Sequence, residues 1–416
     1  MCRVIIRVWI FVILFVLLWQ TSLAENKRTY GTDKSLHRSL FTLDTHIDTP
    51  IRLALPGFEI GVSYNYRNYY SAVDIDRLIE GGLDAGFWAI YSPQGLLSKA
   101  SFDISYINAK RRLSQIITMV SNYPRHFRLA RSVSEVLETT EEGRHVVVMS
   151  MENAYPIGKE LNRLDGFYQS GVRMLGLVHT RNNQFADSST DRAGPRWRGL
   201  SPLGVQLVLK ANRLGMILDA SHASDQALEQ LLEISRAPIV LSHSGVKSVF
   251  EHPRNVGDRL LKKLAKSGGV ISMNTYGTYL KALKVDSRRS DERQVLVQQM
   301  YDAEDLGEPM SFERFSEGFL SIDKKYAPER ASIDEYMRHF LYALELLGPE
   351  HVGVGADWDG GGGVVGLEDV SMINKITTIL TEKGYSESEL SNIWSGNVLR
   401  VFDKVEAVAA HLRAKP

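Results

Sequence analysis

Residues 145–152 read HVVVMSME, a nearly continuous apolar run that ends in the carboxylate of Glu152. Such runs are typical of parallel strands that helices cover on both faces, because these strands lack the alternation of apolar and polar residues. Seven further runs share this character: 41–48, 85–92, 172–179, 215–222, 238–244, 269–275 and 351–357. Amphipathic stretches such as 227–234 and 332–347 lie between them, so strand and helix alternate along the chain.

This alternation predicts the α/β class and, within it, a (β/α)8 TIM barrel. The alternative is an open, doubly wound sheet, which would carry a glycine-rich phosphate turn after an early strand. The sequence has no such turn, and the glycines at 360–363 lack the lysine and the spacing of a P-loop. Ser332 and Glu335 have the spacing of a capping box, which predicts that a helix begins there.

The composition limits the function classes. The 416 residues have a formal net charge of zero, with 44% hydrophobic and 24% charged residues, as in an ordinary soluble globular protein. A neutral chain gives no electrostatic reason to expect nucleic acid as a partner. No linker divides the chain, so we expect one domain over residues 25–416. Residues 281–330 form a connection too long for one barrel helix, which we interpret as a lid or substrate-recognition insertion or as an inert surface excursion.

The N-terminus has the pattern of a secretory signal peptide. Arg3 and Arg7 precede the apolar run 8–19, and small residues before residue 25 suit cleavage after Ala24. Residues 1–24 are therefore predicted to be removed, together with Cys2, which is the only cysteine. We expect an exported protein, periplasmic or extracellular; an uncleaved signal would leave an N-terminal membrane anchor, and no other membrane association is predicted.

Ionisable side chains gather where the apolar runs end. They are His46, Asp48, Glu152, His179, His222, His243 and Asp357. Residues at the C-terminal ends of barrel strands converge on one active site, so we expect these side chains to meet there. A single histidine at a strand end is more often structural than a ligand, but a structural explanation would have to hold for each of these residues separately.

The side chains suit a pair of metal ions. His46 and Asp48 are two residues apart in a strand and so point to the same side. Glu152 has two oxygens and could bridge two cations, with His46 and Asp48 on one ion and His222 and His243 on the other. Imidazole and carboxylate without thiolate suit Zn²⁺ best, with Mn²⁺, Co²⁺ or Fe²⁺ also compatible.

Several motifs together resemble those of the membrane (renal) dipeptidase family, peptidase family M19, among the amidohydrolase-like metallopeptidases. The resemblance covers nearly all of the chain that follows residue 24. The matching segments are 44–48 (DTHID), 152–153 (EN), 171–179 (GVRMLGLVH), 182–183 (NN), 199–204 (GLSPLG), 212–216 (NRLGM), 219–222 (DASH), 242–244 (SHS), 252–255 (HPRN) and 355–360 (GADWDG).

The resemblance implies a binuclear zinc enzyme that hydrolyses dipeptides with a free C-terminal carboxylate, by a hydroxide that bridges the ions. It implies that His179 contacts the substrate carbonyl and stabilises the oxyanion, that Arg254 holds the terminal carboxylate, and that Asp357 handles the proton and meets the substrate amine. Thr45, Ile47, Asn153 and Trp358 depart from the residues usual in the family. These departures leave the ligands intact and change the shape of the pocket.

Two other functions stay open at this point. A barrel lactonase or phosphotriesterase would use the same metal pair, but those enzymes often bridge their ions with a carbamylated lysine after the fourth strand, where this chain has His179. A metal-binding protein of the cell envelope with a lapsed active site is the other alternative. The expected partner is a small dipeptide, and the sequence leaves a monomer or a homodimer open.

Overall fold

The computed structural model describes residues 35–65 and 68–414, so the predicted signal peptide lies outside the described residues. The chain forms two compact units, residues 1–39 and 40–416. The described part of the first unit is helix α2 (Ser35–Ser39). Among the described residues, no helix has the length and apolar character required to cross a membrane.

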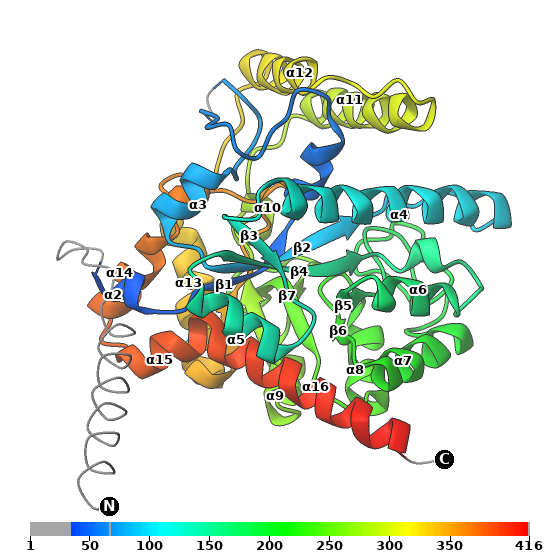
Figure 1. Ribbon diagram of the computed structural model, residues 1–416, viewed down its shortest axis with the longest axis vertical. Coiled ribbons are helices and arrows are strands. Elements are labelled where there is room, and N and C mark those ends of the chain that lie inside the picture. Colours follow the sequence, from blue (N-terminus) through cyan, green and yellow to red (C-terminus); the bar gives the residue numbers. More distant parts are fainter. Residues whose placement is uncertain (1–34, 66–67, 415–416) are drawn as a thin grey trace, which may run out of the picture. The chain divides into compact units, whose positions relative to one another are not determined.

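Parallel strands form the centre of the second unit, and helices surround them (Figure 1). The strands are β1 (Leu43–Ile47), β2 (Ala85–Tyr91), β3 (Phe127–Leu129), β4 (His145–Glu152), β5 (Val172–Gly176), β6 (Ile217–Asp219), β7 (Val240–Val246), β8 (Asn255–Val256), β9 (Val270–Met273) and β10 (Val352–Val354). The α-helices are α3 (Ile75–Gly81), α4 (Lys99–Asn122), α5 (Val133–Glu141), α6 (Arg163–Gln169), α7 (Pro202–Leu214), α8 (Asp225–Ile234), α9 (Asp258–Lys266), α10 (Gly277–Leu280), α11 (Ser287–Asp305), α12 (Phe312–Lys325), α13 (Ile333–Leu347), α14 (Asn374–Glu382), α15 (Glu387–Ser391) and α16 (Asn397–Ala414). Short helical turns are η1 (Thr49–Ala54), η2 (Tyr155–Ile157), η3 (Pro349–His351), η4 (Val370–Met372) and the π-helical η5 (Asn392–Gly396).

Seven of the eight apolar runs contain one complete strand of the main sheet, and the run 238–244 contains β7 except for its last two residues. These strands neighbour one another in the order β1-β2-β4-β5-β6-β7-β9-β10, and every pairing is parallel. The predicted TIM barrel is therefore confirmed. Two short strands were not predicted: β3 pairs with β4, and β8 pairs with β7. The capping box at Ser332 is also present and begins α13.

The barrel is nearly closed: β10 and β1 lack a backbone ladder, and side chains join them instead. The Asp44 carboxylate accepts hydrogen bonds from the backbone N–H of Ala356 at 3.1 and 3.2 Å. The Thr45 hydroxyl lies 2.5 Å from the carbonyl of Ser242 and 3.0 Å from the carbonyl of Val354, between which its single proton is shared. A single parallel bridge between Ile47 and Trp358 adds a backbone contact. We call this junction the seam.

The main core lies toward the N-terminal ends of the strands. There, apolar strand residues such as Leu43, Phe87 and Val148 form one buried cluster with Val401 and Phe402 of α16. This packing fills the barrel at one end with apolar side chains, so polar groups gather at the other end, where the strands terminate.

The predicted insertion, residues 281–330, contains helices α11 and α12. The two helices lie side by side at the top of Figure 1. The loop that follows α10 leads into α11, and α13 follows α12 after a short connection. The last turn of α11 is fastened to α4, where Nδ2 of Asn108 donates to Oδ1 of Asp305 at 2.7 Å.

Candidate active site

The predicted site residues lie within or just beyond the strands, at the end where the strands terminate. His46 lies in β1, and Glu152 is the last residue of β4. The prediction that His243 ends its strand is wrong, because β8 pairs with Gly245 and Val246 and extends β7 past it.

The other predicted residues at run ends lie outside the ladders. Asp48 follows β1 directly, and His179, His222 and Asp357 each lie three residues beyond β5, β6 and β10. In these segments beyond the strands, side chains form hydrogen bonds with backbone groups that no neighbouring strand pairs. For example, the Asp219 carboxylate accepts a hydrogen bond from the N–H of Ser221 at 3.0 Å, which turns the chain toward the barrel mouth before His222.

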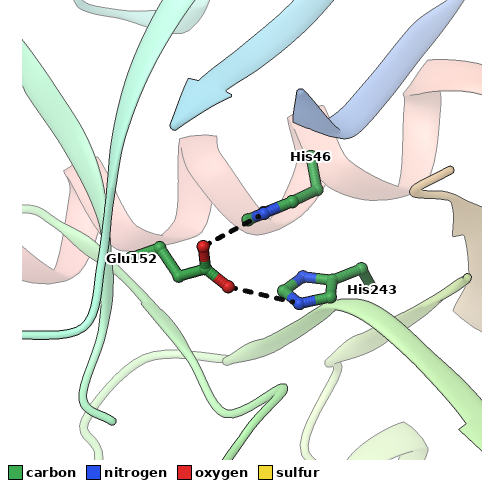
Figure 2. Close-up of side chains that lie close together, drawn as sticks. All are labelled: His46, Glu152 and His243. Carbon is green, nitrogen blue, oxygen red and sulfur yellow. Dashed lines mark ion pairs between the residues drawn. The ribbon is translucent and has the colours of Figure 1, made fainter. Parts of the chain in front are cut away.

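Glu152 is the centre of the site. Its Oε2 lies 3.6 Å from Nε2 of His46, and its Oε1 lies 3.5 Å from Nε2 of His243 (Figure 2). The same Oε1 is 2.9 Å from Nε2 of His222 and 3.8 Å from Nε2 of His179. One oxygen of the Glu152 carboxylate thus faces the imidazole of His46, and the other faces three further imidazoles.

Two more carboxylates stand on the His46 side. Nε2 of His46 is 3.3 Å from Oδ2 of Asp48, and Asp357 belongs to the same cluster. Three overlapping groups result, in each of which the potential ligand atoms lie within 4.8 Å of one another. They are His46, Glu152 and His243; Glu152, His179 and His222; and His46, Asp48 and Asp357.

This donor set fits metal ions. Both ring nitrogens of His46, Oδ1 of Asp48 and Nδ1 of His222 are buried and lack a hydrogen-bond partner among the described residues. Buried polar atoms are seldom left without a partner. Nε2 of His222 and Nε2 of His243 are only 2.8 Å apart. Burial, together with nearby cationic side chains, lowers the pKa of both rings well below the ordinary value, so both are neutral and can act as ligands.

Arg254 is completely enclosed beside this cluster, with 2% of its surface exposed. Its Nη2 lies 3.4 Å from Nε2 of His222 and donates to the carbonyl of His243 at 3.0 Å; Nη1 donates to the carbonyl of Ser221. Its guanidinium carbon stands 5.3 Å from the ring centre of Tyr279. Nε has no partner among the described residues, so the guanidinium retains a donor for a ligand.

A carboxylate relay fixes the orientation of His243. The Ser242 hydroxyl donates to Oδ2 of Asp219 at 2.6 Å and lies 2.8 Å from Nδ1 of His243. Since its only proton is directed to Asp219, the hydroxyl accepts from Nδ1–H of His243. The lone pair of that ring is then on Nε2, the nitrogen that faces Glu152.

The loop after β10 is shaped by the carboxylates that it carries. Asp357 and Asp359 have left-handed backbone angles, with φ of 64° and 67°. A Cβ atom on Gly360 would clash with Oδ2 of Asp48 and Oδ1 of Asp357. The Asp359 carboxylate ties the loop to the barrel by accepting hydrogen bonds from the Thr49 hydroxyl and the Ala72 N–H, each at 2.7 Å.

Comparison with known proteins identifies the family. The family profile described as membrane dipeptidase, peptidase family M19, matches residues 32–416. The chain belongs to this family. It is 31% identical to dipeptidase verJ of Clonostachys rogersoniana over 350 residues, which cover 82% of this chain and 77% of the relative. It is 29% identical to dipeptidase tcpJ of Claviceps purpurea over 343 residues, 81% of this chain and 70% of the relative. The crystal structure of the probable dipeptidase PvdM from Pseudomonas aeruginosa superposes with a TM-score of 0.76, at 29% identity, over 90% of this chain and 98% of that one.

The chain is thus a hydrolase of the M19 dipeptidase family, and the family resemblance read from the motifs is confirmed. Sequence reasoning assigned no role to several residues of this M19 site. Asp219 and Ser242 lie in matched motifs, and this could have indicated that they belong to the site. The Tyr91 hydroxyl lies 3.5 Å from Nδ1 of His179, but Tyr91 lies in none of the motifs.

Ser242→Ala is expected to weaken metal binding about 10-fold to 10²-fold, because the relay no longer holds the His243 tautomer that faces the site. Titration of the metal-free protein with zinc would measure this loss. Ser248→Ala is the matched control, since the Ser248 hydroxyl donates to Asp258 in an exposed position. Equal zinc affinity of Ser242→Ala and the parent would contradict the role of the relay.

Gly360→Ala is expected to displace the carboxylates of Asp48 and Asp357 and to lower turnover of this M19 enzyme by about 10²-fold. Gly257→Ala provides the control, because a Cβ there meets nothing within 4 Å and φ is −78°. Dipeptidase activity and metal content of both variants would be measured together. If Gly360→Ala kept the activity of the Gly257 variant, the close approach at residue 360 would have no functional importance.

Proposed function

We propose that this chain is a binuclear zinc dipeptidase that hydrolyses dipeptides with a free C-terminal carboxylate. One observation carries the proposal: Glu152 directs Oε2 to His46 and Oε1 to His222 and His243. That arrangement suits a carboxylate that bridges two cations, with Asp48 as a further ligand on the His46 side. Mn²⁺, Co²⁺ or Fe²⁺ would suit the same donors.

Two ions bound there would supply a nucleophile from water at neutral pH and polarise the scissile carbonyl. The chain itself moves the proton. Burial and the neighbouring Asp48 carboxylate raise the pKa of Asp357 well above its ordinary value. A carboxylate with a raised pKa can take a proton from the attacking water and return it to the leaving amine, and the same group can meet the substrate amine.

His179 serves as a neutral hydrogen-bond donor in this proposal. Burial lowers the pKa of His179, so its ring is uncharged at neutral pH. The Tyr91 hydroxyl lies 3.5 Å from Nδ1 and can donate to it, which would leave the proton on Nε2. Nε2 faces Glu152, and a proton there points to where the oxyanion of the tetrahedral intermediate would form.

Arg254→Ala is expected to raise KM for dipeptides with a free carboxylate about 10²-fold, because the substrate carboxylate loses its buried partner. The loss should be much smaller for C-terminally amidated dipeptides. Steady-state kinetics on both substrate series would measure it, with Arg259→Ala as an exposed control. Equal losses on both series would contradict the assignment.

The function is tested by assaying alanyl dipeptides, with L- and D-configured C-terminal residues, after removal of metal and after addition of zinc. Zinc-dependent hydrolysis is expected, with about two ions per chain by elemental analysis. A protein that holds two ions but hydrolyses only lactones or phosphotriesters would favour the other barrel hydrolases. Two bound ions without turnover of any of these substrates would favour a binding protein.

We also propose that the chain is exported and cleaved after Ala24, with an uncleaved membrane anchor as the alternative outcome. Arg3, Arg7 and the apolar run 8–19 support this. N-terminal sequencing of the protein recovered outside the cytoplasm tests it, and a start at residue 25 is expected.

A further inference from the structure

We propose that Tyr301, on helix α11 of the insertion, is a substrate-binding residue whose hydroxyl hydrogen-bonds the N-terminal half of the bound dipeptide. The inference rests on the proposed function and extends it to the 281–330 insertion. It follows from how α11 is fastened to the barrel, from the surroundings of the Tyr301 hydroxyl, and from its place around the barrel mouth.

A buried ion pair holds one face of α11 against α4. Glu304 lies three residues after Tyr301, so the two side chains share a face of the helix. Oε2 of Glu304 is 3.1 Å from Nη2 of Arg112, and these side chains are only 10% and 6% exposed. Nη1 of Arg112 donates to the carbonyl of Pro50 at 3.0 Å, two residues after Asp48. The face that carries Tyr301 is therefore held beside the segment that supplies a predicted metal ligand.

The Tyr301 hydroxyl is buried and has no hydrogen-bond partner in the part of the chain that the structure describes. Burial raises the pKa of Tyr301 above its ordinary value, so the hydroxyl keeps its proton and can donate as well as accept. A buried hydroxyl without a partner is destabilising, and a ligand that supplies a hydrogen bond removes that cost.

Charged groups of the reaction site act electrostatically on Tyr301 and on its neighbour Tyr91. Burial and then the neighbouring Tyr301, followed by Glu152 and Asp48, raise the pKa of Tyr91 well above its ordinary value. Burial raises the pKa of Tyr301, Arg112 lowers it, and Glu304 and then Asp48 raise it. The Tyr91 hydroxyl at the end of β2 lies 3.5 Å from Nδ1 of His179, and Arg112 joins Glu304 to the carbonyl of Pro50 just after β1, so we place Tyr301 on the β1 and β2 side of the reaction site.

The order of the strands around the barrel indicates which half of the substrate lies near Tyr301. Tyr91 ends β2 and Arg254 follows β7, and these strands are second and sixth in the order of eight, on opposite sides of the barrel. With the terminal carboxylate at Arg254, the other end of a dipeptide extends toward β1 and β2. The N-terminal residue, with an ammonium group that offers three N–H donors, is then the part that reaches Tyr301.

The test is Tyr301→Phe, which removes only the hydroxyl. We expect KM for dipeptides, and the inhibition constant of a phosphinate dipeptide mimic, to rise about tenfold. We expect kcat to change by less than about twofold and the metal content to stay constant. The control is Tyr326→Phe in the same insertion, where the hydroxyl donates to Oε1 of Glu292 at 2.9 Å and the kinetics should not change.

A second variant tests the placement. Glu304→Gln weakens the ion pair with Arg112 and should raise KM in the same direction, and adding it to Tyr301→Phe should cost little more, because both act through one contact. Unchanged KM and inhibition constant in Tyr301→Phe, or an equal rise in Tyr326→Phe, would overturn the inference. Failure of the proposed function would look different, since the parent protein itself would then neither hydrolyse dipeptides nor bind the mimic.

Discussion

Glu152→Gln is expected to lose bound metal and dipeptidase activity together. The amide is neutral and keeps only one oxygen acceptor, so it cannot face His46 on one side and His222 and His243 on the other with negative charge. We expect zinc occupancy to fall below about one ion per chain. We expect kcat/KM to fall by at least about 10³-fold. Elemental analysis after dialysis, paired with a dipeptide assay, measures both quantities.

Glu233→Gln is the matched control for this experiment. Glu233 pairs with Lys263 at the surface, with 59% of its side chain exposed, so the same chemical change there should alter neither quantity. The bridging role of Glu152 would be refuted by a Gln variant that keeps both ions at full occupancy.

Asp357→Asn is expected to keep its metal ions and to lose about 10²-fold to 10⁴-fold in kcat, because the amide cannot accept and return a proton. The backbone at this position is left-handed, and asparagine tolerates that conformation better than most residues. Loss of activity should therefore reflect the chemistry and not a displaced loop. Thermal unfolding and metal analysis verify that the loop is intact.

The exposed Asp403 of α16 offers the control substitution Asp403→Asn, which should be without effect. An Asp357→Asn variant that retained near-parental kcat would remove Asp357 from proton transfer. Loss of both ions from that variant would instead make Asp357 a ligand.

The barrel could be predicted because its strands are covered on both faces. All eight residues of β4 are buried, and this leaves an unbroken apolar run in the sequence. β3 and β8 could not be predicted, because segments of three and two residues, FRL and NV, are too short to show a period. The position of His243 within β7 also depends on β8, which the sequence does not reveal.

The proposed metal ligands could be predicted because each has a side chain that is costly to bury alone. The remaining site residues depend on which segments meet in the folded chain. Arg254 could be assigned only through the family resemblance of its motif, since a lone arginine is ordinarily a surface residue, yet it is buried against two carbonyls and a tyrosine. The need for glycine at 360 arises only when the loop after β10 reaches Asp48, and the placement of Tyr301 arises from a pairing of α11 with α4.

The seam is one of the junctions at which the barrel is expected to open most easily. At most junctions, separating two neighbouring strands requires breaking a row of main-chain hydrogen bonds. β6 and β7 share only one registered pair, and between β10 and β1 the Asp44 carboxylate, the Thr45 hydroxyl and one bridge take the place of that row. Low-energy local unfolding concentrates where main-chain pairing is sparse. His46 and Asp357 lie on the two sides of the seam, so ions held between them would join β1 to the loop after β10. Hydrogen exchange of the amides near Val354 and Ala356 should therefore slow when the ions are bound.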